Sequence, residues 1–182
     1  MKFFKGSRNE TQLVKIRSVY FILGLIIGMT VSMSSKLYAS DENGEAVCLA
    51  KNIYFEAGNQ PLAGKVAVAH VVLNRMEHSF YPKDVCGVVY QAKWRENWKG
   101  KMVPIRHQCQ FSWFCDGYSD EPKDEKTYNE IYKLAEEFIA GKHKDMIDIT
   151  DGAMWYHADY VHPRWANHKE VTTKVGRHIF YR

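Results

Sequence analysis

Glu56 is the residue of this chain whose type and position best suit acid–base chemistry. It lies within Ile53–Gly58, near the end of a segment in which apolar residues recur at helical spacing. A carboxyl group donates a proton near neutral pH only when its pKa is raised, and apolar neighbours such as Phe55 and Ala57 favour that. Cleavage of a glycosidic bond requires such a donor. Taken alone the signal is weak, because a glutamate near a helix end is usually a solvated surface residue.

Three helices and three strands are expected to position this residue in an α+β fold. The first predicted helix is Ala46–Ala57, which Gly58 terminates. The second begins after Pro61 and runs to Met76. The third has Asp120 as its N-cap and ends at Gly141. The second is apolar on most sides, so it should be the buried element against which the Glu56 helix packs. The predicted strands are Met154–His157, Glu170–Val175 and His178–Tyr181, with a tight turn at Gly176–Arg177. Residues 92–117 are expected to be irregular and aromatic-rich.

The first 40 residues have the order of a secretory signal. Basic residues precede the apolar run Val19–Val31, and a serine-rich stretch then leads to a plausible cleavage point at Ala39. The alternative is an uncleaved membrane anchor through residues 19–33. In either case we expect residues 41–182 to be exported, to the periplasm or the medium, or held at the inner membrane.

The leader also accounts for most of the positive charge. Residues 1–40 hold six Lys+Arg and one Glu, so the 25 basic and 21 acidic residues become 19 and 20 over 41–182, a formal charge of −1. No basic stripe with interleaved aromatic residues remains, so we expect no nucleic-acid partner. The remaining 142 residues or so suit one compact domain, which we expect to be a monomer.

The cysteines Cys48, Cys86, Cys109 and Cys115 all lie in the part predicted to be exported. An even number in an oxidising compartment indicates disulfides, and four cysteines allow three pairings. We expect Cys109–Cys115, which bracket a short loop, and Cys48–Cys86, which would tie the first two helices together. Zinc is an alternative, but no Cys-x-x-Cys or His-Glu-x-x-His spacing is present. A cysteine nucleophile would leave an odd thiol unpaired.

Several segments together make the chain similar to one family. They are Tyr54–Ala57, Gly64–Arg75, Val85–Gln91, Cys109–Ser112, Asp116–Gly117, Trp155–His157, Pro163–Ala166 and Thr173–Tyr181. In this order, and over nearly all of residues 46–182, they resemble the SleB-type cell wall hydrolases, a family that includes the spore cortex-lytic enzymes. The resemblance implies a lysozyme-like catalytic domain over residues 41–182, mostly helical with a small β-hairpin region. It also implies that peptidoglycan glycan strands are the substrate and that Glu56 is the acid.

Family members of this type resemble lytic transglycosylases, in which one acid suffices. The acid would protonate the oxygen between N-acetylmuramic acid and N-acetylglucosamine, then accept the proton of the muramoyl 6-hydroxyl, which leaves a 1,6-anhydro sugar. A hydrolytic muramidase would instead need a second carboxylate about 5–10 Å away, and the candidates are Asp116, Asp120 and Asp159. Gln60 stands where the family often has a second glutamate, which motivates a further alternative, a non-catalytic peptidoglycan-binding module.

The same motifs imply further site residues. Thr173 would act near the cleaved bond by holding an acetamido group or a water, and its alternative is a plain strand residue. The implied substrate-binding residues are Tyr54, Gln110, Phe111, Ser112, Trp155, Tyr156, His157, Trp165 and His178. A core role is the alternative for the aromatic residues, and for Tyr54 it is preferred because a regular helix points it away from Glu56. Asn74 and Arg75 are expected to brace the second helix rather than contact ligand.

The histidines raise the alternative of a zinc-dependent N-acetylmuramoyl-L-alanine amidase. His157, His162, His168 and His178 cluster in the sequence, but their spacings match neither zinc motif named above. Polar loop and strand positions explain them better. We therefore expect neither a metal nor another cofactor.

Overall fold

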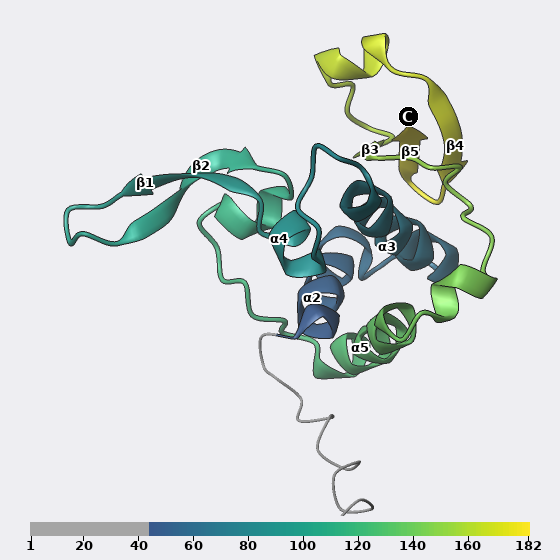
Figure 1. The fold of residues 1–182 in the computed structure, drawn as a ribbon, viewed down its shortest axis with the longest axis horizontal. Coiled ribbons are helices and arrows are strands. Elements are labelled where there is room, and N and C mark those ends of the chain that lie inside the picture. Colours follow the sequence, from purple (N-terminus) through teal and green to yellow (C-terminus); the bar gives the residue numbers. More distant parts are fainter. Residues whose placement is uncertain (1–43) are drawn as a thin grey trace, which may run out of the picture. The chain divides into compact units, whose positions relative to one another are not determined.

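The computed structural model describes residues 44–182, and the leader predicted over residues 1–40 lies outside this part. The described helices are α2 (Glu45–Ala57), α3 (Leu62–Glu77), α4 (Val85–Val89) and α5 (Glu125–Ile139), with the 3-10 helices η2 (Ser112–Cys115), η3 (Lys142–Asp145) and η4 (Arg164–His168). The strands are β1 (Ala92–Glu96), β2 (Met102–Cys109), β3 (Trp155–Ala158), β4 (Val171–Val175) and β5 (His178–Tyr181). This combination confirms the α+β class (Figure 1). No helix within residues 44–182 is long and apolar enough to span a membrane.

Helices α2 and α3 lie at the centre of the core. α2 packs against α3, α4 and α5 (Figure 1), and its residues Leu49, Ile53 and Ala57 are fully buried. Every residue of α3 from 67 to 73 is buried, which confirms that this helix is enclosed on most sides. Full burial of one aliphatic side chain stabilises a fold by about 1.5–3 kcal/mol. This packing therefore fixes the end of α2, where Glu56 lies.

Strands β3, β5 and β4 form an antiparallel sheet in that order, with β5 in the centre. Phe180 pairs with Tyr156 on one side and with Thr173 on the other, so these three side chains share one face. We call it the inner face, because here Phe180 packs against Ala67 and Val71 of α3. The sheet thereby presents Tyr156 to the helical core.

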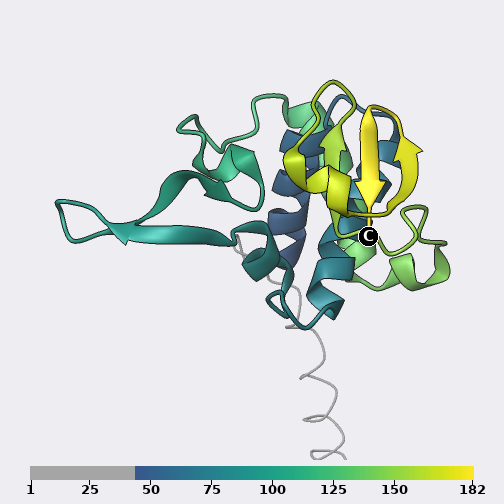
Figure 2. The same cartoon turned by 90° about the horizontal axis from the view of Figure 1, so that it is seen from above.

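The prediction that residues 92–117 are irregular is wrong. The segment contains an antiparallel hairpin of β1 and β2. We call residues 92–109 the arm, and it extends away from the helices (Figure 1 and Figure 2). No residue of either strand is buried. The sequence therefore lacks the sustained alternation of apolar and polar residues that identifies a half-buried strand. Pro104 also argues against a strand in the sequence, although a two-stranded edge tolerates it.

The third helix begins later than predicted, and Asp120 is not its N-cap. α5 starts at Glu125, and the Asp124 carboxylate accepts hydrogen bonds from the Thr127 N–H (3.1 Å) and hydroxyl (2.7 Å). Pro122 explains the shift, because a residue that precedes proline is disfavoured in helical conformation. Residues 116–124 therefore form a loop that runs beside the end of α2.

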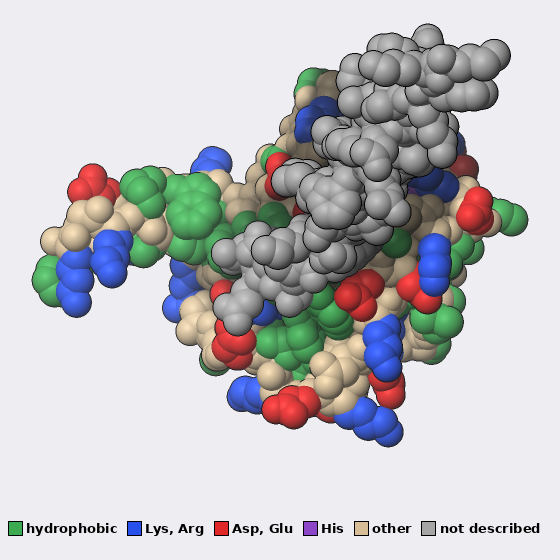
Figure 3. Space-filling view, turned by 60° about the horizontal axis from the view of Figure 1, so that its bottom comes forward, with side chains coloured by type: hydrophobic (Ala, Val, Ile, Leu, Met, Phe, Trp, Pro, Cys, Tyr) green, Lys and Arg blue, Asp and Glu red, His purple; other side chains and the backbone are tan. Residues whose placement is uncertain are grey.

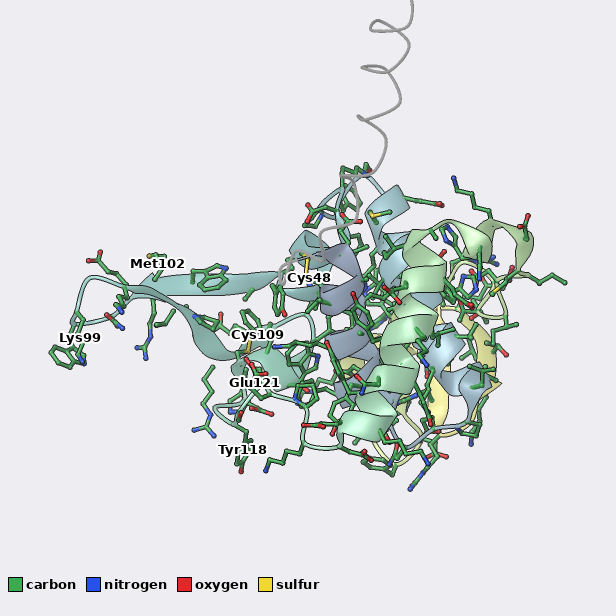
Figure 4. All side chains as sticks on the ribbon, turned by 90° about the horizontal axis from the view of Figure 1, so that it is seen from below. Cys48, Lys99, Met102, Cys109, Tyr118 and Glu121 are labelled. Atoms are coloured by element: carbon green, nitrogen blue, oxygen red, sulfur yellow. A yellow bond between two sulfur atoms is a disulfide. The ribbon has the colours of Figure 1, made fainter. Side chains whose placement is uncertain are left out.

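The structure has the predicted disulfides, Cys48–Cys86 and Cys109–Cys115. The first joins α2 to α4, and the second joins the end of β2 to η2. Figure 4 labels Cys48 at the helices and Cys109 at the base of the arm. The first disulfide therefore cross-links two helices of the core, and the second cross-links the base of the arm to the 3-10 helix that follows it.

Candidate active site

Glu56 lies in the last turn of α2, half-buried, and the Tyr156 hydroxyl donates a hydrogen bond of 2.9 Å to its Oε2. Burial raises the pKa of Glu56, whereas the Tyr156 hydrogen bond and the positive charge of Arg75 lower it, and the net direction is upward. No hydrogen bond within residues 44–182 occupies Oε1. Glu56 thus combines a raised pKa with an available oxygen, as a general acid requires.

Tyr156 acts as a hydrogen-bond donor because it stays protonated. Its burial and the adjacent Glu56 carboxylate hold the pKa of its hydroxyl well above the usual value of 10.0. On the inner face its ring contacts the rings of His178, 5.1 Å away, and Phe180, 5.4 Å away. Burial lowers the pKa of His178, so this histidine is neutral near pH 7, and its buried Nδ1 has no partner among the described residues.

Arg75, which is expected from the sequence to brace the second helix, also lies near Glu56. Its Nε donates to the Met154 carbonyl oxygen over 2.8 Å, and its guanidinium lies 4.9 Å from the Phe111 ring centroid and 5.5 Å from that of Tyr81. Burial lowers its pKa, while Tyr156, Tyr81 and Glu56 oppose that shift. Arg75 therefore joins α3 to the residue before β3 and places a cation near the Glu56 carboxyl group.

The neighbouring Asn74 braces the same connection. Its Nδ2 donates to Asp148 Oδ2 (2.9 Å) and to the carbonyl oxygen of Ala153 (3.1 Å). Asn74 and Arg75 together hold the chain that leads into β3, and hence the position of Tyr156. Arg75 lies three positions after Val72, on a face of the helix that is otherwise apolar, and a charged residue so placed is the sequence signal that indicates this inward role.

Two adjoining cavities, of about 410 and about 290 Å³, open along the last turn of α2. Tyr54 and Phe55 line both. The other walls are formed by Gly58, Asn59, Asp124 and Thr127 in the larger cavity and by Tyr118, Ser119, Glu121 and Lys123 in the smaller one. We call the two cavities the cleft; Glu56 directly follows two of their lining residues in the chain but lines neither cavity itself. Aromatic faces beside carboxylate, amide and hydroxyl groups are suited to binding sugars.

Tyr54 lines the cleft and also fixes its wall. Its hydroxyl oxygen accepts hydrogen bonds from the backbone N–H groups of Lys123 (3.2 Å) and Asp124 (3.0 Å). Its ring packs edge-on against those of Phe55 and Tyr128. Tyr54 lines the cleft although its helical turn is regular, because the loop before α5 packs against its side chain.

Two of the three candidate second carboxylates, Asp116 and Asp159, have partners other than Glu56. Asp159 forms ion pairs with Lys174 (3.1 Å) and Arg177 (3.4 Å), and Asp116 accepts a hydrogen bond from the Tyr118 N–H. Burial and the charge of Asp116 raise the pKa of Asp120. No carboxylate is among the groups in the described part of the chain that shift the pKa of Glu56.

The remaining predicted aromatic residues lie on the outer face of the sheet, opposite Tyr156. His157 contacts the rings of Trp165 and Tyr181 there, and the Lys169 ammonium lies 3.1 Å from the Trp155 ring centroid. Thr173 is on the inner face, two strands from Tyr156. The structure thus places Thr173 and His178 on the same sheet face as Tyr156, which contacts Glu56, and does not place Trp155, His157 or Trp165 there.

The segment 110–112 and Gln60 have supporting positions. Phe111 is buried against Arg75, whereas Gln110 and Ser112 are exposed, and none of the three lines the cleft. Gln60 Oε1 accepts a hydrogen bond of 3.3 Å from the Arg177 N–H in the turn between β4 and β5. A Cβ at Gly176, where φ is +57°, would lie 2.6 Å from that oxygen. The turn therefore requires glycine at this position.

Among residues 44–182, no three acidic, histidine or cysteine side chains gather in a way that would hold a metal ion. A sequence model described as Cell Wall Hydrolase matches residues 59–181, two thirds of the chain. The chain belongs to the cell wall hydrolase family. The matched region begins three residues after Glu56, so the role of Glu56 depends on the geometry described above.

Curated relatives and solved structures agree with this family. The chain is 39% identical over 138 residues to the spore cortex-lytic enzyme of Bacillus subtilis, which covers 76% of this chain and 37% of the relative. It is 24% identical over 151 residues to that of Halalkalibacterium halodurans, which covers 82% of this chain and 38% of the relative. The chain thus spans less than half the length of these relatives.

Two solved structures share the fold. The catalytic domain of the Bacillus cereus SleB protein matches with a TM-score of 0.52 and 25% identity, over 80% of this chain and 94% of that domain. The catalytic domain of the germination-specific lytic transglycosylase SleB of Bacillus anthracis matches with a TM-score of 0.54 and 25% identity, over 80% and 99%. Residues 44–182 therefore have the fold of a SleB catalytic domain.

Proposed function

We propose that the protein cleaves the glycan strands of peptidoglycan between N-acetylmuramic acid and N-acetylglucosamine, as a lytic transglycosylase that works outside the cytoplasm. The observation that carries the proposal is the setting of Glu56. One carboxyl oxygen is held by Tyr156 and the other is available, and Tyr54 and Phe55, which precede Glu56 in the same turn of α2, line the cleft. The Bacillus anthracis relative is a germination-specific lytic transglycosylase, which supports the same chemistry.

The first step uses Glu56 as an acid. Its carboxyl group, whose pKa is raised by burial, donates its proton to the glycosidic oxygen, and the bond from C1 of N-acetylmuramic acid to that oxygen breaks. The leaving N-acetylglucosamine departs with a neutral hydroxyl group. The positive charge that develops at C1 is matched by the new negative charge on Glu56, which Tyr156 and Arg75 stabilise.

The second step uses the same carboxylate as a base. It accepts the proton of the muramoyl 6-hydroxyl while that oxygen forms a bond to C1, which gives a 1,6-anhydro ring and restores the acid. No water enters, so no second carboxylate is needed to activate one. This agrees with the contacts of Asp116 and Asp159, which interact with other groups.

Digestion of purified peptidoglycan, followed by mass spectrometry of the released muropeptides, tests the proposal. The expected products carry 1,6-anhydro-muramic ends, each lighter by one water than the corresponding reducing end. Reducing ends would show a hydrolytic muramidase, freed stem peptides would show an amidase, and binding without release would show a binding module. The Glu56→Gln variant serves as the blank, because it lacks the titrating proton.

A further inference from the structure

The arm carries a concentration of positive charge that the chemistry at Glu56 does not use. Residues 92–109 contain the five cations Lys93, Arg95, Lys99, Lys101 and Arg106, and Glu96 is their one acidic residue, for a formal charge of +4. The other residues of 44–182 hold 14 Lys+Arg and 17 Asp+Glu, a formal charge of −3. All five cations are exposed, and none forms an ion pair within the described part of the chain.

Large apolar side chains are interleaved with these charges. Trp98 is 88% exposed, Met102 60% and Trp94 45%. Figure 3 shows hydrophobic side chains along the arm and lysine and arginine side chains at its far end. Such exposure of tryptophan indicates a surface that contacts a ligand.

The far end of the arm is a preformed turn. The Asn97 side chain accepts hydrogen bonds from the N–H groups of Lys99 (2.9 Å) and Lys101 (3.0 Å), and Gly100 has a φ of +72°. The Lys99 ammonium lies 4.6 Å from the Trp98 ring centroid. Because the Asn97 side chain and backbone hydrogen bonds hold this turn, the side chains of Trp98, Lys99 and Lys101 are presented to solvent without supporting the fold.

The base of the arm adjoins the cleft. The Cys109–Cys115 disulfide leads into the loop of Gly117 and Tyr118, and a Cβ at Gly117 would lie 3.8 Å from the Arg106 guanidinium carbon. Tyr118 is itself a wall of the cleft. Figure 4 shows Cys109, Tyr118 and Glu121 near the base of the arm and Lys99 at its far end. Cationic side chains therefore continue from the edge of the cleft to the tip.

We propose that the arm is a second contact surface for peptidoglycan, which binds the acidic stem peptides and sugar rings of polymer that extends beyond the cleft. This inference rests on the proposed function. The free carboxylates of stem peptides complement the cations, and sugar rings stack on exposed tryptophan faces. An anionic lipid surface would satisfy the same charges, but the continuity of the cations with the cleft favours a polymer that occupies both.

Co-sedimentation with purified sacculi tests the arm without turnover. The parent is the full chain with Glu56→Gln, and the arm variant adds Trp98→Ala, Lys99→Glu and Lys101→Glu. The matched control adds Phe80→Ala, Lys133→Glu and Lys144→Glu, because Phe80 is 84% exposed and both lysines are exposed. Binding should weaken about 10-fold in the arm variant and less than about 2-fold in the control.

Two further probes identify the ligand. Sacculi stripped of stem peptides by an amidase should bind the parent several-fold more weakly, and added salt should weaken binding to intact sacculi. Vesicles of anionic phospholipid should not distinguish the parent from the arm variant. The proposal is overturned if the arm variant binds sacculi as the parent does, or if it loses vesicle binding alone.

Failure of this proposal is distinguishable from failure of the proposed function. The arm is judged on binding by proteins that carry Glu56→Gln, whereas the function is judged on products released by the wild-type chain. The arm substitutions in an otherwise wild-type chain should leave cleavage of short glycan chains without stem peptides within about 2-fold. Their effect should be confined to intact sacculi.

Discussion

The Glu56 site and the arm hold their charged groups in opposite settings. At the site, Glu56 and Arg75 are surrounded by Tyr156, Tyr81 and Phe111 at fixed contacts. On the arm, five cations stand in solvent without ion pairs among the described residues. Exclusion of water shifts a pKa and strengthens electrostatic interactions, whereas exposed charges are screened by salt. Chemistry therefore belongs to the first region, and the second can contribute only by contact with a ligand.

One disulfide lies in the core and the other at the base of the arm. Their removal should give the largest effect predicted here, a loss of stability against unfolding. Cys48–Cys86 spans 38 residues within the core, and Cys109–Cys115 spans 6 at the base of the arm. In the chain-entropy model the first contributes about 4 kcal/mol to the free energy of unfolding and the second about 2 kcal/mol. Urea denaturation of the two double Cys→Ser variants measures the difference. If loss of Cys109–Cys115 lowers the free energy of unfolding more than loss of Cys48–Cys86 does, the core disulfide is not the more stabilising of the two.

The second prediction concerns Glu56 itself. Glu56→Gln keeps the size and can still accept the Tyr156 hydrogen bond, but it removes the titrating proton. The rate of muropeptide release should fall at least about 100-fold, or about 2.7 kcal/mol in activation free energy. Glu77→Gln, at the exposed end of α3, is the matched control and should retain full activity. A folded Glu56→Gln variant within a few-fold of wild type would show that another group donates the proton.

Sequence reasoning finds one of these regions much better than the other. The apolar spacing of α2 and α3 locates Glu56 at a helix end, because burial on one side leaves a pattern in the sequence. The arm leaves no such pattern, since its strands are exposed on both faces. The sequence also predicts that Arg75 braces α3 but does not identify its partners, because Met154 and Phe111 lie in segments that are far from Arg75 in the chain. The partners of such tertiary contacts cannot be identified from the local sequence.

The third prediction tests how the site holds its charge. Tyr156→Phe removes the hydrogen bond to Oε2, so the Glu56 carboxylate is less stable and its pKa rises further. Activity should fall about 10-fold, the value of one hydrogen bond to a charged group, and the alkaline limb of the pH–rate profile should move to higher pH. Tyr181→Phe, whose hydroxyl contacts His157 on the outer face, should leave the profile in place. An unchanged limb in Tyr156→Phe would remove Tyr156 from the mechanism.

The smallest expected effect is on stability, and it separates function from folding at the site. The pKa of Glu56 is raised above its usual value of 4.5 in the folded protein. Between the pKa of the unfolded state and that of the folded state, the folded protein therefore binds more protons than the unfolded chain. Stability therefore falls as pH rises through that window, and the ionised Glu56 is destabilising above it. Glu56→Gln should melt a few degrees higher than wild type at pH 7, and the gain should vanish near pH 4. Glu77→Gln is again the control. A Glu56→Gln variant that melts lower at pH 7 would mean that the carboxylate stabilises the fold, and that burial does not dominate its pKa.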